Sequence, residues 1–191
     1  MKICVYGASS RELNSIYYEK AEALGEVLAE RGHTMVFGGG TSGLMGAAAR
    51  GVHRKNGKMI GVAPKFFAEP GILFESCTEM VFTETMSERK KYMEDISDAF
   101  ITLPGGIGTF EEFFETLTLK SLGRHGKAMA ILDINGYYAE LDSMIKHSVD
   151  LSFTPKEVCK LYQIFTDASE LIYYIESYKD EIQELWKTKI F

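Results

Sequence analysis

Seven short apolar runs alternate along the chain with longer segments in which apolar residues recur every three or four positions. A short apolar run is typical of a buried strand, whereas recurrence at helical spacing is typical of an amphipathic helix. The runs predicted as strands or extended segments cover residues 2–7, 34–40, 58–64, 80–84, 98–106, 127–133 and 161–166. Helices are predicted over residues 17–30, 43–55, 86–97, 108–122, 137–149 and 167–187, and a loop over 65–78.

The alternation of strands and helices predicts an α/β fold. The strands are apolar throughout rather than on one side, which indicates a parallel sheet covered by helices on both faces. With right-handed crossovers, the simplest arrangement is a doubly wound, Rossmann-like sheet. We therefore expect a single domain over residues 1–191 whose last helix, at about 167–187, begins with a capping box formed by Asp167 and Glu170.

Composition narrows the partners that such a domain can have. The 191 residues carry a net charge of −6, which disfavours non-specific binding to nucleic acid or to an anionic membrane. The chain has no run of about 18 apolar residues, and its N-terminus lacks the apolar region of a signal peptide. The three cysteines and four histidines have no metal-ligand spacing. We expect a soluble cytoplasmic protein with reduced thiols and no bound metal.

Three glycine-bearing turns, YGASS, GGGTSG and PGGIGT, follow predicted strands at the edge where doubly wound sheets bind ligands. Gly38, Gly40 and Gly43 have the spacing of a dinucleotide-binding fingerprint, but the acidic residue expected about 20 positions later is missing. NAD binding is therefore disfavoured, and these glycines fit a tight turn, a phosphate contact, or both. In the first two turns, the candidate ligand contacts are Ser9, Gly39, Gly40 and Gly43.

The third turn is the more specific signal. Pro104 ends a predicted strand, and a predicted helix follows at once. The intervening glycines let backbone N–H groups approach a ligand, and the positive end of the helix dipole points to the same place. Thr109 adds a hydroxyl, without the Lys-Ser/Thr pair of a Walker motif. A simple tight turn would need fewer glycines, so we predict a phosphate or other anion at Gly105, Gly106, Ile107, Gly108 and Thr109.

Two cations lie near the apolar side of the helix predicted over 86–97. Met86, Met93 and Ile96 define its apolar stripe, and Arg89 and Lys90 fall on either side of Met93. Both side chains can extend around the stripe to solvent. Alternatively, they face a pocket in which an anion neutralises them, since a buried cation must be paired.

Two acids, Glu111 and Glu112, lie in the first turns of the helix that follows PGGIGT. Acidic residues there interact favourably with the helix dipole, which is one sufficient reason for them. Helical spacing places Glu112 away from the apolar stripe, yet a residue at the tip of a helix can overhang a site. There the dipole is expected to keep its carboxylate ionised. The apolar stripe consists of Phe110, Phe113, Phe114 and Leu117.

These motifs together resemble one known family. The run PGGIGTFEE matches the P-G-G-x-G-T-x-x-E motif of the Lonely Guy proteins, the cytokinin-activating phosphoribohydrolases. The segments GGGTSGLMG, MIGVAPKFF, MSERK and LDINGYY resemble further family motifs, whereas Ser87 and the YGASS turn depart from common family residues. Many members have been labelled lysine decarboxylases, but that chemistry requires pyridoxal phosphate on a lysine, and no feature of this sequence locates one.

The resemblance implies a Rossmann-like homodimer without a cofactor. It also implies hydrolysis of the N-glycosidic bond of N6-modified adenosine 5′-monophosphate (AMP), giving free base and ribose 5-phosphate. The family's essential acid and arginine correspond to Glu112 and Arg89. Its substrate contacts correspond to Lys90, Gly106, Ile107, Gly108, Thr109, Glu111 and Thr118.

A homodimer also fits the helix that follows PGGIGT, because Leu119 and Leu122 lie off its phenylalanine stripe. Burial of that helix within one chain is the alternative. The alternative function is a non-catalytic carrier of a nucleotide or of the molybdenum cofactor, since related proteins share the glycine-rich sheet and a fold does not fix a function.

Overall fold

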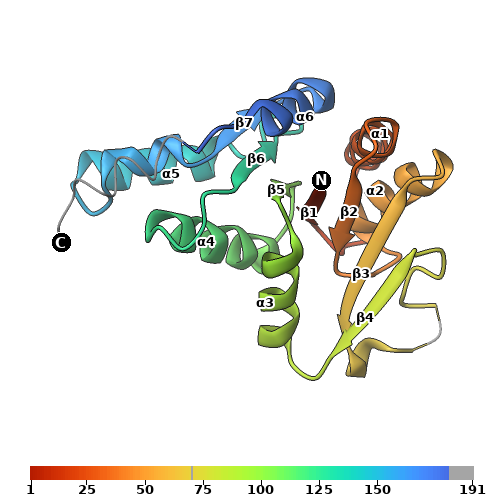
Figure 1. Cartoon of the computed structure of the whole chain (residues 1–191). Helices are drawn as coiled ribbons and strands as arrows, with labels where there is room; N and C mark the ends of the chain where they lie inside the picture. The colour runs from red at the N-terminus through yellow and green to blue at the C-terminus, as the bar shows by residue number, and fades with distance from the viewer. Residues whose placement is uncertain (70, 181–191) are drawn as a thin grey trace.

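A computed structural model describes residues 1–69 and 71–180 of the chain. Its centre is a sheet of seven parallel strands in the order β4-β3-β2-β1-β5-β6-β7 (Figure 1). The predicted α/β fold with a doubly wound parallel sheet is confirmed. The strands are β1 (Lys2–Tyr6), β2 (Thr34–Phe37), β3 (Lys58–Pro64), β4 (Glu79–Thr83), β5 (Ala99–Thr102), β6 (Ala128–Leu132) and β7 (Gln163–Phe165).

Helices cover both faces of this sheet (Figure 1). One face packs against α1 (Ser15–Glu30), α2 (Gly43–Arg54) and α6 (Ala168–Ser177). The other packs against α3 (Met86–Ile96), α4 (Ile107–Ser121) and α5 (Ala139–Asp150). Two short 3₁₀ helices, η1 (Lys65–Phe67) and η2 (Lys156–Lys160), lie in the connections.

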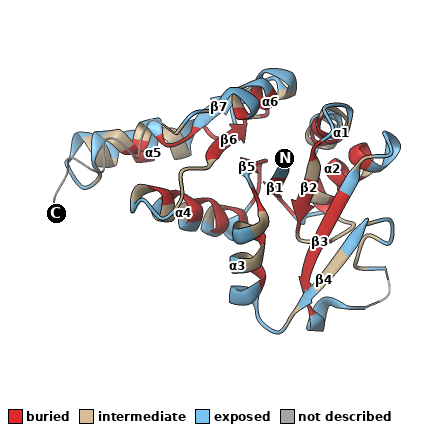
Figure 2. Ribbon diagram, in the orientation of Figure 1, coloured by how far each residue is buried: buried red, intermediate tan, exposed pale blue. Residues whose placement is uncertain are grey.

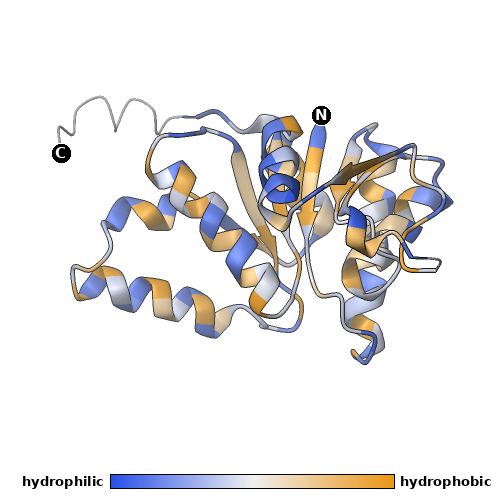
Figure 3. Cartoon of the chain, turned by 90° about the horizontal axis from the view of Figure 1, so that it is seen from below, coloured by the Kyte–Doolittle hydropathy of each residue, from blue (hydrophilic) through white to orange (hydrophobic). Residues whose placement is uncertain are grey.

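The sequence pattern explains why both faces are covered. Ile3 and Val5 of β1 enter the core under α1 and α2, whereas Cys4 and Tyr6 enter the core on the opposite face. All four are buried, as are most residues of the central strands (Figure 2). The helices carry both hydrophobic and hydrophilic residues along their length, as amphipathic helices do (Figure 3).

The strand order reverses between β1 and β5, which lie side by side with Tyr6 opposite Thr102. From β1 the chain continues to β2 on one side, and from β5 it continues to β6 on the other. The connections after these two strands therefore diverge and leave a crevice beyond their carboxyl ends, which is where doubly wound sheets bind ligands.

Several boundaries differ from the sequence-based prediction, and two of the differences matter for the site and the core. The strand predicted over 98–106 ends at Thr102, because the chain turns through Leu103–Gly106 to enter α4. The C-terminal helix ends at Ser177, and Tyr178 leaves it to place its ring 4.7 Å from the Lys120 ammonium. Residues 181–187 of the predicted helix lie outside the described residues.

In residues 1–69 and 71–180, no helix combines the length and the hydrophobicity needed to cross a membrane.

Candidate active site

A cleft of about 630 Å³ opens at the carboxyl ends of β1, β2 and β5. The turns after these strands and the first turns of α3 and α4 line it, together with the loop that follows β3. The crevice at the reversal of strand order is therefore a real cavity. The predicted site residues that line it are Ser9, Gly40, Arg89, Gly106, Ile107, Gly108, Thr109, Glu111 and Glu112.

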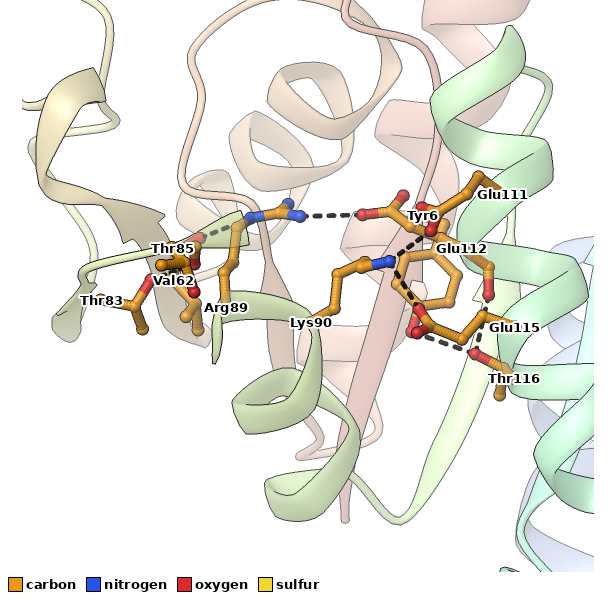
Figure 4. Close-up of polar contacts among 10 residues, drawn as sticks. All are labelled: Tyr6, Val62, Thr83, Thr85, Arg89, Lys90, Glu111, Glu112, Glu115 and Thr116. Atoms are coloured by element: carbon orange, nitrogen blue, oxygen red, sulfur yellow. Dashed lines mark hydrogen bonds and ion pairs between the residues drawn. The ribbon is translucent and has the colours of Figure 1, made fainter. Parts of the chain in front are cut away.

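A buried ion pair joins α3 to α4 at the wall of the cleft (Figure 4). Arg89 Nη1 donates to Glu112 Oε1 at 2.9 Å, and Arg89 Nε donates to the Val62 carbonyl at 3.0 Å. Arg89 is 6% exposed and Glu112 is 8% exposed. Both residues line the cleft, so the pair combines burial with access to a ligand.

Local structure directs the arginine inward. α3 begins with a capping box in which the Thr85 side chain accepts from the Glu88 N–H, and Glu88 accepts from the Thr85 N–H. This fixes the start of the helix, and Arg89 follows on its buried side. A Cβ on Gly38 would lie 2.3 Å from Arg89 Nη2, so a glycine is needed there to make room for the guanidinium.

The prediction that Glu112 faces away from the packed side of its helix is wrong. Phe110 and Phe114 are only half-buried, so the stripe of aromatic residues overstated which side packs. The helix turns a mixed polar and apolar face inward, and Arg89 makes burial of Glu112 feasible because it neutralises the carboxylate. The buried face consists of Thr109, Glu112, Phe113, Thr116, Leu117 and Lys120.

Two opposing effects set the protonation of Glu112. Burial raises the pKa of its carboxyl, and the charge and hydrogen bond of Arg89 lower it, with burial the larger effect. Among the neighbouring charges, Arg89 contributes most to favouring the charged form. The effect of the helix dipole on this carboxylate stays a prediction.

The Lys90 side chain points in a different direction from that of Arg89. Its ammonium forms ion pairs with Glu111 and, at 2.9 Å, with Glu115 (Figure 4). One residue along a helix is a rotation of about 100°, so Lys90 faces the outer side of α4 while Arg89 faces the cleft. Lys90 lies outside the cleft lining, and its contact with a substrate stays a prediction.

The glycine-rich turn presents open backbone groups. Gly106 is the N-cap of α4 and no side chain caps the helix, so the first N–H groups have no intrahelical partner. A Cβ placed on Gly40, Gly106 or Gly108 would meet no atom within 4 Å, and none of the three has a left-handed φ. Every other glycine of the described residues has a close neighbour or a left-handed φ. These three all line the cleft, where a ligand can approach the bare backbone.

Four other predicted contacts lie outside the lining of the cleft. A Cβ on Gly43 would lie 2.0 Å from the Ala8 carbonyl, and one on Gly105 would lie 2.1 Å from Thr109 Oγ1. Gly39 has a left-handed φ of 74°. Thr118 is exposed on α4. None of these four lines the cleft, so a direct substrate contact by any of them stays a prediction.

The sequence reasoning missed two parts of the cleft. Arg11, just after the first glycine turn, lines it and donates from Nε to Ser42 Oγ at 2.9 Å. Its position just after β1 is the only feature of the sequence that indicates a place in the cleft. The second part is an apolar wall, most of which comes from segments that show no periodicity or were assigned to the core. It consists of Met45, Phe67, Ile72, Leu73 and Met86.

Among residues 1–69 and 71–180, no three His, Cys, Asp or Glu side chains lie close enough together to hold a metal ion.

Comparison with known proteins assigns the family. A family model described as "Possible lysine decarboxylase" matches residues 45–175. Two cytokinin riboside 5′-monophosphate phosphoribohydrolases of Arabidopsis thaliana, LOG2 and LOG7, are each 37% identical to this chain. The alignments cover 93% and 96% of this chain and 83% and 85% of the relatives. This chain belongs to the Lonely Guy family. A Lonely Guy protein of Oryza sativa is 36% identical over 95% of this chain and 75% of its own.

Solved structures agree on the fold. A molybdenum cofactor binding protein from Rippkaea orientalis superposes with a TM-score of 0.70 at 21% identity, covering 92% of this chain and 95% of its own. The molybdenum cofactor carrier protein of Chlamydomonas reinhardtii gives 0.69 at 22% identity, with the same coverage. At such identities the likeness establishes the shared Rossmann-like fold and nothing about the ligand.

Proposed function

We propose that this Lonely Guy protein hydrolyses the N-glycosidic bond of AMP-type nucleotides that carry a substituent on N6, releasing the base and ribose 5-phosphate. One observation carries the proposal: a buried carboxylate–guanidinium pair and an uncapped, glycine-rich helix start line the same cleft. The names of the relatives, which act on cytokinin riboside 5′-monophosphates, point to the same reaction.

The 5′-phosphate is assigned to the start of α4. Free N–H groups at Gly106, Ile107 and Gly108, with the helix dipole behind them, suit a phosphate monoester. Arg11 adds a positive charge to the same cleft. Arg89 is already neutralised by Glu112, so Arg11 is the cation better able to pair with the phosphate.

The ribose is assigned to the neighbourhood of Glu112. Breaking the bond between C1′ and N9 builds positive charge on the sugar, as in glycoside hydrolysis. An ionised Glu112 stabilises that charge and orients a water molecule. The water oxygen bonds to C1′, and the electron pair of the broken bond leaves with the base. One water proton passes to the base, and the other remains on the new C1′ hydroxyl.

The apolar wall of the cleft suits the substituent of the base. Met45, Phe67 and Met86 belong to this wall, and Phe67 and Met86 are also exposed. An isoprenoid group on N6 would cover such surface from water, whereas the bare amino group of AMP would not. The preferred substrate is therefore a nucleotide with an apolar N6 substituent.

We also propose that the protein is a cytoplasmic homodimer that does not bind nucleic acid. Leu122, the residue that ends α4, is 59% exposed, so the end of this helix leaves apolar surface uncovered in a single chain. Light scattering checks the dimer directly, and Leu122→Glu is expected to shift it towards monomer. The three free cysteines and the net charge of −6 agree with a reducing compartment and with the absence of a nucleic-acid partner.

The test of the reaction is product analysis. Purified protein is incubated with AMP and with N6-isopentenyl-AMP, and the products are separated by chromatography. We expect free base and ribose 5-phosphate from both, with a higher kcat/KM for the isopentenyl compound. Tight binding of both nucleotides without release of base would contradict the proposal and favour a carrier.

A further inference from the structure

The loop between β6 and α5 lies against the glycine-rich turn, and the reaction proposed above gives it no role. This loop carries the sequence LDINGYY, whose last two residues donate hydrogen bonds into the turn between β5 and α4. The Tyr137 hydroxyl donates to the Gly105 carbonyl at 2.5 Å, and the Tyr138 hydroxyl donates to the Leu103 carbonyl at 2.7 Å. We propose that Tyr137 and Tyr138 are positioning residues that hold this turn ready for a phosphate monoester.

The loop is built to present these two tyrosines. Asn135 and Gly136 both have left-handed φ values, 56° and 73°, which reverse the chain just before them. The Asp133 carboxylate accepts the backbone N–H of Tyr138 at 3.0 Å. Tyr138 is 1% exposed, so its ring is fixed by packing. The two tyrosine rings also meet edge to face, with centroids 5.0 Å apart.

Peptide geometry links Tyr137 to the anion site. In a trans peptide, the carbonyl of one residue and the N–H of the next point in opposite directions, and the described part of the chain contains no cis peptide. Since the Gly105 carbonyl is turned towards Tyr137, the Gly106 N–H is turned away from that ring. Gly106 lines the cleft, so this bond orients the first donor of the proposed phosphate site.

The turn needs such an external constraint. Consecutive glycines have many accessible backbone conformations, and a loop that must select one of them loses binding energy. Strand pairing of β5 ends at Thr102, after which the Leu103 N–H donates to the Tyr6 carbonyl and the Ala8 N–H donates to the Pro104 carbonyl. The first helical bond of α4 runs from the Phe110 N–H to the Gly106 carbonyl, so these backbone bonds leave the Gly105 carbonyl to Tyr137. The two hydroxyls act on the carbonyls on either side of Pro104, at Leu103 and Gly105.

The inference rests on the phosphate site of the proposed function but not on the hydrolysis itself. Its test uses carbocyclic analogues of AMP and adenosine, in which a methylene replaces the ring oxygen, so that no oxocarbenium ion forms and the ligands stay intact. Dissociation constants of both are measured by calorimetry for the full-length wild type and for Tyr137→Phe. The variant keeps the ring and loses only the hydroxyl.

We expect Tyr137→Phe to weaken binding of the phosphorylated analogue roughly five- to tenfold, as for the loss of one hydrogen bond, while binding of the nucleoside analogue is unchanged. A merely structural role would weaken both ligands alike. Tyr173→Phe is the matched control, because Tyr173 is 67% exposed on α6, and it should change neither constant. If Tyr137→Phe fails to fold, Tyr138→Phe tests the second hydroxyl, on the Leu103 carbonyl, with the same two ligands and the same criterion.

The inference is overturned if the ratio of the two dissociation constants is the same in wild type and variant. It is equally overturned if wild type binds the phosphorylated analogue no more tightly than the nucleoside analogue. If the ratio falls as expected but wild type releases no base from AMP, the positioning role stands and the hydrolase proposal fails.

Discussion

Arg89 on α3 and Glu112 on α4 form an ion pair 2.9 Å long, in which each residue is less than one tenth exposed. This pair joins the two helices at the wall of the cleft (Figure 4). Burial raises the pKa of the Glu112 carboxyl, and the charge and hydrogen bond of Arg89 oppose that shift. The arginine therefore both joins α3 to α4 and favours a negative charge next to the cleft.

Removing the arginine is expected to destabilise the fold. Arg89→Met leaves Glu112 buried without a partner, which should lower the free energy of unfolding by about 3–5 kcal/mol at pH 8. The deficit should shrink below the ordinary pKa of glutamate, because Glu112 is then neutral in both the folded and the unfolded state. Urea unfolding at pH 8 and pH 4 measures both effects.

A control on the same helix isolates the contribution of burial. Lys91 pairs with Asp95 at the surface, and its side chain is 67% exposed. Lys91→Met should change stability by less than about 1 kcal/mol. An equal loss in the Arg89 and Lys91 variants would mean that the Arg89–Glu112 pair behaves as a surface pair.

Neutralising the acid is expected to separate binding from turnover. Glu112→Gln keeps the shape of the side chain and its acceptor oxygen for Arg89 but removes the negative charge. Turnover of N6-isopentenyl-AMP should fall about 10²- to 10⁴-fold, with little change in the dissociation constant of the nucleotide. Glu115→Gln on the exposed side of α4 is the control and should keep most activity. Unchanged turnover in the Glu112 variant would remove this residue from the reaction.

Two neighbouring glycines should respond differently to the same substitution. Gly106 has open space where a Cβ would lie, so Gly106→Ala should leave stability unchanged and weaken nucleotide binding. Gly105 has Thr109 Oγ1 at 2.1 Å from that position, so Gly105→Ala should lower stability instead. Thermal unfolding and AMP calorimetry on both variants check this contrast. Unimpaired AMP binding by Gly106→Ala would place the phosphate elsewhere.

The pattern of apolar positions predicts the seven strands, their parallel arrangement and the place of the cleft. It can do so because a strand that is buried on both faces must be apolar throughout, and this is visible in its own sequence. The same pattern does not predict the orientation of a polar side chain that depends on a partner elsewhere in the chain. The position of Glu112 depends on Arg89, which lies on another helix. The partners of Lys90 likewise come from a second helix, α4. Contacts between two helices cannot be predicted from the residue spacing within one of them.

Chain ends and loops show the same limit. Residue 178 lies within the last predicted helix (167–187), yet Tyr178 leaves the helix and its ring covers the Lys120 ammonium. The wall residues Phe67 and Leu73 come from a loop without periodicity, so only their three-dimensional placement assigns them to the cleft.

A second buried cation gives a prediction about pH. Lys120 is 1% exposed and donates to the Leu161 carbonyl at 2.8 Å. Burial lowers the pKa of its ammonium from 10.5 to about 8, although Asp180 acts in the opposite direction. Below pH 8 the lysine is charged in both states, and the fold carries the full cost of burying the charge. Between pH 8 and pH 10.5 only the unfolded chain keeps the proton, so wild-type stability gains with rising pH.

Lys120→Met lacks this gain. We compare the free energy of unfolding of the variant with that of wild type. The variant's value minus the wild-type value should decrease by about 2–3 kcal/mol as the pH is raised from 7 to 10. Urea unfolding of both proteins at the two pH values measures the difference, and other titrating groups cancel. A difference that does not depend on pH would show that Lys120 keeps an ordinary pKa in the fold.

The most direct test of the site is a crystal structure of the protein with the carbocyclic analogue of AMP. We expect the phosphate on the backbone N–H groups of Gly106–Gly108 and the carbon equivalent to C1′ facing the Glu112 carboxylate, with the base towards the apolar wall. A phosphate bound elsewhere, or a sugar ring remote from Glu112, would contradict the proposed site and the reaction derived from it.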